Sequence, residues 1–282
     1  MRPSLLPLIF FCAITSALAS GAPTLADQAY GPAPEQRFDL HAPAGATAAP
    51  LILMVHGGGW TFGDKEMGRV VDHKTERWLP RGIAFVSINY RMQPVAPPLE
   101  QARDVARALA EVQKNAEKYG IDRNNIVLMG HSAGAHLIGL LAASPALAAE
   151  QGAAPWLGTI LLDSGALDVT AIMNARHLPL YDHAFGSDPA FWRASSPFHL
   201  LKGTGAPLLA VCSSRRQDSC PQATNFVARA TALGRQASVL PQDLSHGDIN
   251  RLLGEDSAYT TAVEAFMAGL DPALAKRLDT RR

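Results

Sequence analysis

The stretch Ile126-Val127-Leu128-Met129-Gly130-His131-Ser132-Ala133-Gly134 decides the fold of this chain. An apolar strand runs into Gly-x-Ser-x-Gly, and a run of small and apolar residues typical of a buried helix follows. The two glycines allow a tight turn because they carry no Cβ. Ser132 would then stand clear of the sheet, with the positive end of the following helix directed at its hydroxyl. The stretch predicts a serine placed to attack a carbonyl carbon.

Apolar segments of strand length alternate with segments of helical periodicity along the rest of the chain. The predicted strands are 37–41, 51–55, 83–88, 125–129, 159–162, 207–212 and 237–240, and the predicted helices are 99–119, 133–143, 223–233 and 257–267. Continuous apolar strands are typical of a sheet covered on both faces. The pattern therefore predicts an α/β fold with a mostly parallel sheet and helices on both faces.

Two segments depart from this alternation. Residues 163–205 are rich in aromatics and predict a short insertion between late strands, which either walls a pocket near the active site or is a surface excursion anchored by its aromatics. Residues 20–36 are rich in Ala, Gly and Pro and predict a loosely held leader. The mature domain would span 20–282.

The N-terminus has the organisation of a secretory signal peptide. Arg2 precedes an apolar run over 5–19 that ends in Ala17-Leu18-Ala19. We expect residues 1–19 to be removed, with later cleavage near Ala22 or Ala26 as an alternative. The apolar run is short for a membrane span, although an uncleaved anchor is the other interpretation. The sequence predicts a periplasmic or secreted protein without a stable membrane span after cleavage.

Export also affects the interpretation of the cysteines. Cys12 lies in the predicted signal peptide, which leaves Cys212 and Cys220 as an even pair. An oxidising compartment favours a disulfide between them over two buried thiols.

Composition excludes several functional classes. The 282 residues contain 25 Lys+Arg and 25 Asp+Glu, and no long run of one sign occurs, so nucleic-acid binding has no support. We find no dinucleotide fingerprint, phosphate loop or Cys/His cluster of metal-site type, and therefore expect no cofactor and no metal. The sequence leaves the oligomeric state open.

The predicted strand 51–55 leads into His56-Gly57-Gly58-Gly59-Trp60. Three successive glycines leave backbone N–H groups unshielded, so we expect the N–H groups of Gly58 and Gly59, with that of Ala133, to form an oxyanion hole. A plain flexible turn is the alternative. Trp60 and His131 are candidates for lining the pocket.

A serine nucleophile needs a base and a group that orients the base. His246 lies in a polar loop after the last predicted strand, where the chain order Ser, acid, His places the base. Asp218 follows the strand 207–212 within the Cys212–Cys220 loop and is the favoured acid. Asp163, at the end of the preceding strand, is the competitor, and Asp168 and Asp243 are weaker candidates.

These motifs together resemble the α/β-hydrolase superfamily, and more narrowly its HGGG-type carboxylesterase and arylformamidase-like branch. The similarity runs from about Arg37 to the last helix and rests on His56–Trp60, Gly63-Asp64-Lys65, Asn89-Tyr90-Arg91, the helix with Asp104, Gly130–Gly134, Asp218 and His246-Gly247. One departure is the acid loop, because no glycine shortly precedes Asp218.

The resemblance implies a serine hydrolase that cleaves small carboxylic esters through an acyl-enzyme on Ser132, with a small-molecule ester as its partner. An arylformamidase-like amide hydrolase is a second hypothesis, since the two reactions use the same groups. A non-catalytic binding module is a third, because a fold does not fix a function.

Overall fold

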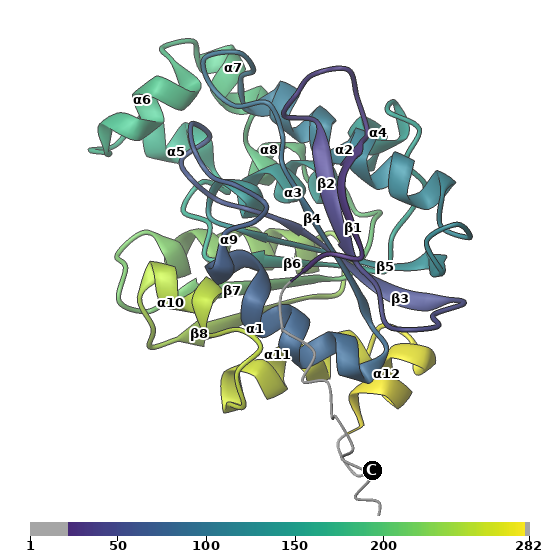
Figure 1. The fold of residues 1–282 in the computed structure, drawn as a ribbon. Coiled ribbons are helices and arrows are strands. Elements are labelled where there is room, and N and C mark those ends of the chain that lie inside the picture. Colours follow the sequence, from purple (N-terminus) through teal and green to yellow (C-terminus); the bar gives the residue numbers. More distant parts are fainter. Residues whose placement is uncertain (1–21, 280–282) are drawn as a thin grey trace, which may run out of the picture.

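The computed structural model describes residues 22–279, so the predicted signal peptide 1–19 lies outside the described residues. Within 22–279, eight strands form one sheet in the order β1-β2-β4-β3-β5-β6-β7-β8 (Figure 1). Their bounds are β1 Leu25–Ala29, β2 Arg37–His41, β3 Ala49–Val55, β4 Ala84–Ile88, β5 Ile121–His131, β6 Gly158–Leu162, β7 Leu208–Ser213 and β8 Ala237–Gln242. β2 pairs antiparallel with both of its neighbours, β1 and β4, and the other five strand pairs are parallel. The predicted mostly parallel sheet is confirmed.

Side chains of the central strands alternate between two apolar cores. Leu51, Leu53 and Val55 of β3 pack in the core on one face, and Ile52 and Met54 pack in the core on the other. All of β3 is buried, as expected for a strand covered on both faces. The sequence therefore reads as a continuous apolar run rather than as an alternating pattern.

The helices cover both faces of the sheet (Figure 1). α2 Pro98–Lys114, α3 Ala133–Ala143 and α4 Pro145–Ala149 contribute to one core, with α9 Ser219–Ala232 beside them. α1 Gly68–Trp78, α10 His246–Arg251, α11 Ala258–Ala268 and α12 Pro272–Leu278 contribute to the other core. The short 3-10 turn Leu79–Arg81 directly follows α1.

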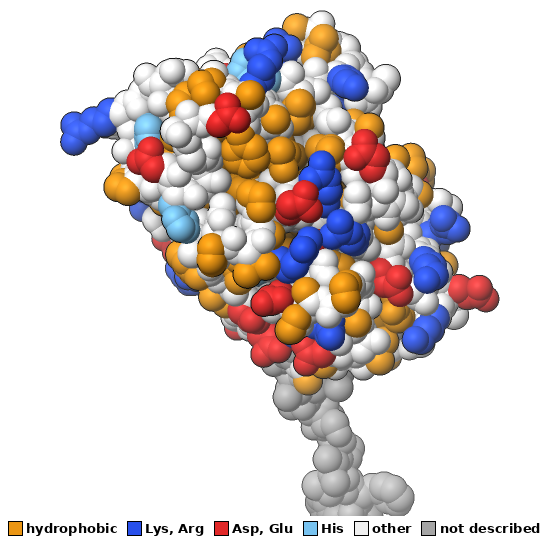
Figure 2. All heavy atoms as spheres, turned by 90° about the horizontal axis from the view of Figure 1, so that it is seen from above, with side chains coloured by type: hydrophobic (Ala, Val, Ile, Leu, Met, Phe, Trp, Pro, Cys, Tyr) orange, Lys and Arg blue, Asp and Glu red, His pale blue; other side chains and the backbone are white. Residues whose placement is uncertain are grey.

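The insertion between β6 and β7 consists of short helices: α5 Val169–Met173, α6 Pro179–Phe185, α7 Pro189–Ala194 and α8 Pro197–Leu200. Tyr181 and Phe185 of α6 are buried in the same core as α2 and α3. Figure 2 shows the molecule from the top of the view in Figure 1. Hydrophobic side chains gather near the middle of this face, and both Lys/Arg and Asp/Glu side chains border them.

Two predicted boundaries are wrong. Residues 25–29, expected in a loose leader, form the edge strand β1. α2 ends at Lys114 instead of continuing to Tyr119. The Asn115 side chain donates hydrogen bonds to the carbonyl and side-chain oxygens of Glu111, at 3.0 and 2.6 Å. This local bonding competes with continuation of the helix.

Cys212 and Cys220 form the predicted disulfide, with their Cα atoms 5.0 Å apart. The bond joins the end of β7 to the first turn of α9. Across residues 22–279 no helix combines the length and apolarity needed to span a membrane.

Candidate active site

Ser132 lies at the turn between β5 and α3, as the opening motif predicts. Its backbone adopts φ 56° and ψ −118°. A Cβ on Gly134 would lie 2.3 Å from the carbonyl oxygen of Val55, and one on Gly130 would lie 2.7 Å from the backbone of Gly134. Both motif glycines are therefore required by close backbone approach.

Unusual backbone conformations concentrate around this turn. Among the non-glycine residues of 22–279, positive φ angles occur at Ser132 (56°), Trp60 (61°), Asp163 (55°) and Asp27 (52°). Ser132 and Asp163 directly follow the neighbouring strands β5 and β6, and Trp60 lies in the loop after β3. Such conformations cost free energy and cluster at functional sites.

A continuous chain of hydrogen bonds joins three side chains here. His246 Nε2 lies 3.0 Å from Ser132 Oγ, and His246 Nδ1 lies 2.5 Å from Asp163 Oδ2. With Nδ1 protonated and donating to Asp163, Nε2 is free to accept the serine proton. His246 is the first residue of α10, and the Ser245 side chain caps that helix.

The predicted assignment of Asp218 as the partner of His246 is corrected by this geometry. The Asp218 carboxylate pairs with Arg216 Nη2 at 2.9 Å, while Asp163 occupies the position beside His246. The sheet explains this placement, because Ser132 N–H donates to the carbonyl oxygen of Leu162, the residue before Asp163, at 2.9 Å. The ends of β5 and β6 thus hold Ser132 and Asp163 next to each other.

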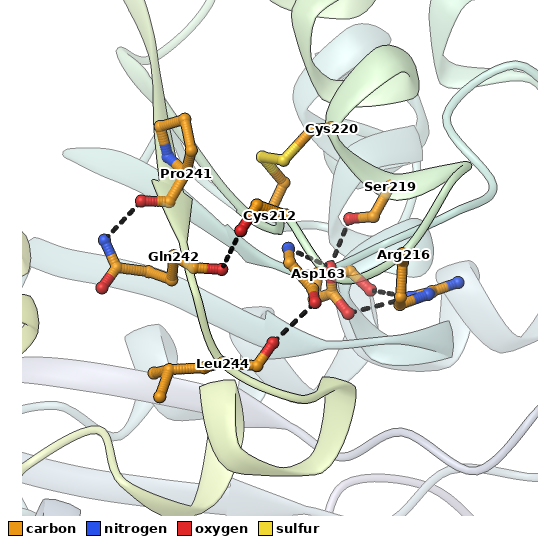
Figure 3. The surroundings of a disulfide bond; sticks show 10 residues. Asp163, Cys212, Arg216, Ser219, Cys220, Pro241, Gln242 and Leu244 are labelled. Carbon is orange, nitrogen blue, oxygen red and sulfur yellow. Dashed lines mark hydrogen bonds and ion pairs between the residues drawn. A yellow bond between two sulfur atoms is a disulfide. The ribbon is translucent and has the colours of Figure 1, made fainter.

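Asp163 is fully buried and receives several hydrogen bonds besides that from His246 (Figure 3). Ser213 N–H donates to Oδ1 at 2.7 Å, the Ser219 hydroxyl donates to the same oxygen, and Arg216 Nη1 donates to Oδ2 at 2.8 Å. Burial alone would raise the pKa of Asp163, but the hydrogen bonds from His246 and Ser219 and the charge of Arg216 hold it well below its ordinary value. The carboxylate is therefore ionised at neutral pH.

His131, a predicted pocket residue, contacts both the backbone and the ring of His246. Its Nε2–H donates to the backbone oxygen of His246 at 2.8 Å, and the two rings lie 4.5 Å apart between centroids. Burial and the neighbouring His246 lower the pKa of His131 to about 3. His131 is therefore neutral, and it fixes the backbone from which His246 projects.

The glycine loop after β3 lies against the nucleophile. A Cβ on Gly57 would be 2.8 Å from Ser132 Cβ, and Gly58, Gly59 and Ala133 line the same cavity as Ser132. Ala133 is the first residue of α3, so its N–H has no acceptor within the helix. The three residues predicted to supply oxyanion donors thus line the cavity at Ser132.

Trp60 lines the cavity as predicted and ties the glycine loop to the rest of the site. Its Nε1–H donates to His136 Nδ1 at 3.1 Å, and His136 Nε2–H donates to the Ser195 carbonyl oxygen at 2.8 Å. The Trp60 ring also packs on Phe185 at a centroid distance of 4.9 Å. One aromatic residue therefore connects the loop, α3 and the insertion.

The cavity at Ser132 has a volume of about 770 Å³. Its lining includes Arg69 and Arg216 but no Asp or Glu. Phe62, Leu178 and Leu180 line it while remaining 61%, 60% and 40% exposed. The arrangement can hold an organic molecule against the serine, with apolar side chains at the entrance.

Sequence reasoning missed Arg216, Ser213 and Ser219 as partners of Asp163. The signal was their regular spacing of three residues inside the segment closed by the two cysteines. That spacing had no interpretation before the position of Asp163 was known.

The amino-acid sequence is similar to a family model and to several esterases. A sequence model of the BD-FAE family matches residues 38–159. The probable carboxylic ester hydrolase LipM of Mycobacterium tuberculosis is 30% identical over 246 residues, which cover 78% of this chain and 54% of LipM. The probable isoprenylcysteine alpha-carbonyl methylesterase ICMEL1 of Oryza sativa subsp. japonica is 36% identical over 109 residues, covering 38% of this chain and 25% of that protein.

Among solved structures, a truncated carbohydrate esterase from gut microbiota superposes with a TM-score of 0.77 at 18% identity, covering 90% of this chain and 98% of the other. This likeness concerns the fold. The chain spans about a quarter to a half of the length of the two curated relatives above. By its sheet, its nucleophile turn and these similarities, the chain belongs to the α/β-hydrolase superfamily.

Proposed function

We propose that this protein is a carboxylic ester hydrolase with Ser132 as nucleophile, His246 as general base and Asp163 as the acid that orients His246. The single observation that carries the proposal is the continuous hydrogen-bonded chain from Ser132 through His246 to Asp163, next to the glycine loop. The esterase names of the sequence relatives support the same reaction class.

The chemistry follows from the positions of the atoms. His246 Nε2 takes the proton of Ser132 as Oγ attacks the ester carbonyl, and Asp163 stabilises the imidazolium that forms. The N–H groups of Gly58, Gly59 and Ala133 are the expected donors to the oxyanion. His246 then protonates the leaving alcohol, and water activated by the same residue hydrolyses the acyl-enzyme.

The test uses a fluorophosphonate probe and short p-nitrophenyl esters. We expect one adduct per chain in the wild type and none in Ser132→Ala, with ester turnover lost to the same extent. Ser164→Ala is the matched control, because Ser164 is the other serine that lines the cavity and its variant should still be labelled. A labelled Ser132→Ala, or a wild type that neither labels nor turns over esters, contradicts the proposal and favours a binding module.

An amide substrate is the second candidate within the same geometry. The His56–Trp60 loop supports the HGGG-type, arylformamidase-like branch, whose members share this machinery. Turnover of p-nitrophenyl acetate and p-nitroacetanilide, measured side by side, separates the two. We expect the ester to be preferred.

We also propose that the protein acts in the periplasm or outside the cell. The N-terminal apolar segment and the Cys212–Cys220 disulfide support this location. N-terminal sequencing of the exported protein should give a chain that begins after Ala19.

A further inference from the structure

The loop between β7 and α9 surrounds one buried carboxylate with donors. Ser213, Arg216 and Ser219 each donate a hydrogen bond to Asp163, and they recur every third residue. Cys212 and Cys220 close this loop directly before the first donor and directly after the last (Figure 3). The loop is thus built as a support for Asp163 and is held at both ends by a covalent bond.

Arg216 is the charged donor of this loop, and it contacts two members of the proposed triad. Its Nη1 lies 2.8 Å from Asp163 Oδ2 and 3.0 Å from His246 Nδ1. A guanidinium stays protonated and can only donate. Arg216 and His246 therefore direct N–H groups at the same oxygen of Asp163, which keeps that carboxylate ionised and in one orientation.

Arg216 is also held from its other side. Its Nη2 pairs with Asp218 Oδ2 at 2.9 Å. A Cβ on Gly165 would lie 2.7 Å from that Asp218 oxygen, 2.9 Å from Arg216 Nη2 and 3.0 Å from the Tyr181 hydroxyl, so a side chain at position 165 would press on this polar group. With carboxylates on both sides, the guanidinium cannot turn into the cavity without losing an ion pair.

We propose that Arg216 is a positioning residue of the ester hydrolysis, which acts through Asp163 to orient His246 and depends on the disulfide-closed loop for its own position. The inference rests on the proposed function, because it assigns a role to a neighbour of the triad. It also gives Asp218 a role as the second carboxylate that holds Arg216.

The experiment compares Arg216→Met with Arg216→Lys and Arg215→Met. Arg215 is the matched control, because it precedes Arg216 in the same loop, is 54% exposed and pairs with Asp243 away from the triad. Since a shift of about 1 Å in a catalytic group can cost roughly 100-fold, we expect Arg216→Met to lower kcat by about 10- to 100-fold with little change in KM. Arg216→Lys should recover part of the loss, and Arg215→Met should stay within about twofold of the wild type.

A pH profile of kcat/KM separates positioning from a merely structural role. Arg216→Met removes a cation 3.0 Å from His246 Nδ1 and thereby favours the imidazolium. Because the neutral imidazole is the active base, the acidic limb of the profile should move to higher pH. A structural defect would lower the thermal midpoint without moving this limb.

The outcomes distinguish the two proposals. An active wild type, with Arg216→Met as active as Arg215→Met, overturns the inference and leaves the proposed function intact. A drop in kcat with an unmoved acidic limb and no recovery in Arg216→Lys overturns it as well. A wild type without ester turnover or fluorophosphonate labelling overturns the proposed function itself, and the role of Arg216 with it.

Discussion

The turn after β6 and the loop after β7 make an instructive comparison. They follow neighbouring parallel strands at the same edge of the sheet, and each carries an aspartate. Asp163 has a side chain that is 0% exposed and meets donors from four residues, whereas the Asp218 side chain is 44% exposed and pairs with Arg216. Chain order limits the acid to this edge, but the convergence of buried donors determines which aspartate reaches His246.

The largest expected effect tests this comparison directly. Asp163→Asn should lower kcat by roughly 1,000- to 10,000-fold, because the imidazolium loses its counter-charge and His246 its tautomer. Asp218→Asn should cost less than about threefold, since it weakens only one side of Arg216. Both variants are assayed on a p-nitrophenyl ester, and the reverse ranking would restore Asp218 as the acid.

Opening the disulfide should weaken the loop after β7 and leave the turn after β6 intact. For a loop of this length, the Cys212→Ser/Cys220→Ser variant should lose about 2–3 kcal/mol of unfolding free energy in urea. We expect kcat to fall several-fold with KM unchanged. Dithiothreitol should reproduce this loss in the wild type and have no effect on the variant. If reduced wild type keeps its full kcat, the loop holds Asp163 without the bond.

The pH dependence of stability should also separate the two aspartates. The pKa of Asp163 is depressed in the folded protein and is about 3.9 in an unfolded chain. Ionised Asp163 thus stabilises the fold above pH about 4, and this contribution is lost as the pH falls. Between about pH 5 and 3, the unfolding free energy should fall more steeply in wild type and Asp218→Asn than in Asp163→Asn. Equal slopes in all three would show that Asp163 is not stabilised as an anion.

The smallest effect concerns a single neutral donor. Ser219→Ala removes one of the hydrogen bonds to Asp163 Oδ1. A hydrogen bond to a charged group contributes about 1.5–3 kcal/mol to stability, and because only part of this acts on the orientation of His246, we expect kcat to fall by about 2- to 10-fold. Ser214→Ala is the matched control, because the Ser214 hydroxyl donates to the Gln242 carbonyl oxygen on the exposed side of the same loop. Equal activity of the two variants would mean that Ser219 is dispensable.

The nucleophile Ser132 and the base His246 could be predicted from the sequence, because a local motif specifies the first and chain order the second. The strand, two glycines and helix around Ser132 specify one turn, and His246 follows the last strand. The acid could not be chosen in this way. Its position depends on contacts between residue 163 and the loop 213–219, which lie about 50 residues apart in the chain. The three-residue spacing within that loop does not by itself indicate which aspartate the loop contacts.

β1 and α1 could not be predicted from the sequence, because neither has a regular apolar pattern. β1 has the sequence Leu-Ala-Asp-Gln-Ala, and no residue of this edge strand is fully buried, so it lacks an apolar pattern. The buried face of α1 includes Lys74 and Thr75 besides Val70, Val71 and Trp78. Lys74 Nζ donates to the carbonyl oxygen of Asn250 at 2.6 Å, which makes its burial possible but interrupts the hydrophobic periodicity.

The close backbone approach at Gly130 and Gly134 separates two kinds of constraint within one five-residue motif. A library that replaces each position with every amino acid can be sorted once by the amount of protein that accumulates and once by product formed. Changes at 130 and 134 should fail the first sort, since any side chain there collides with main-chain atoms. Changes of Ser132 to the small residues alanine and glycine should pass the first sort and fail only the second, so that the letters of the motif divide into architecture and chemistry.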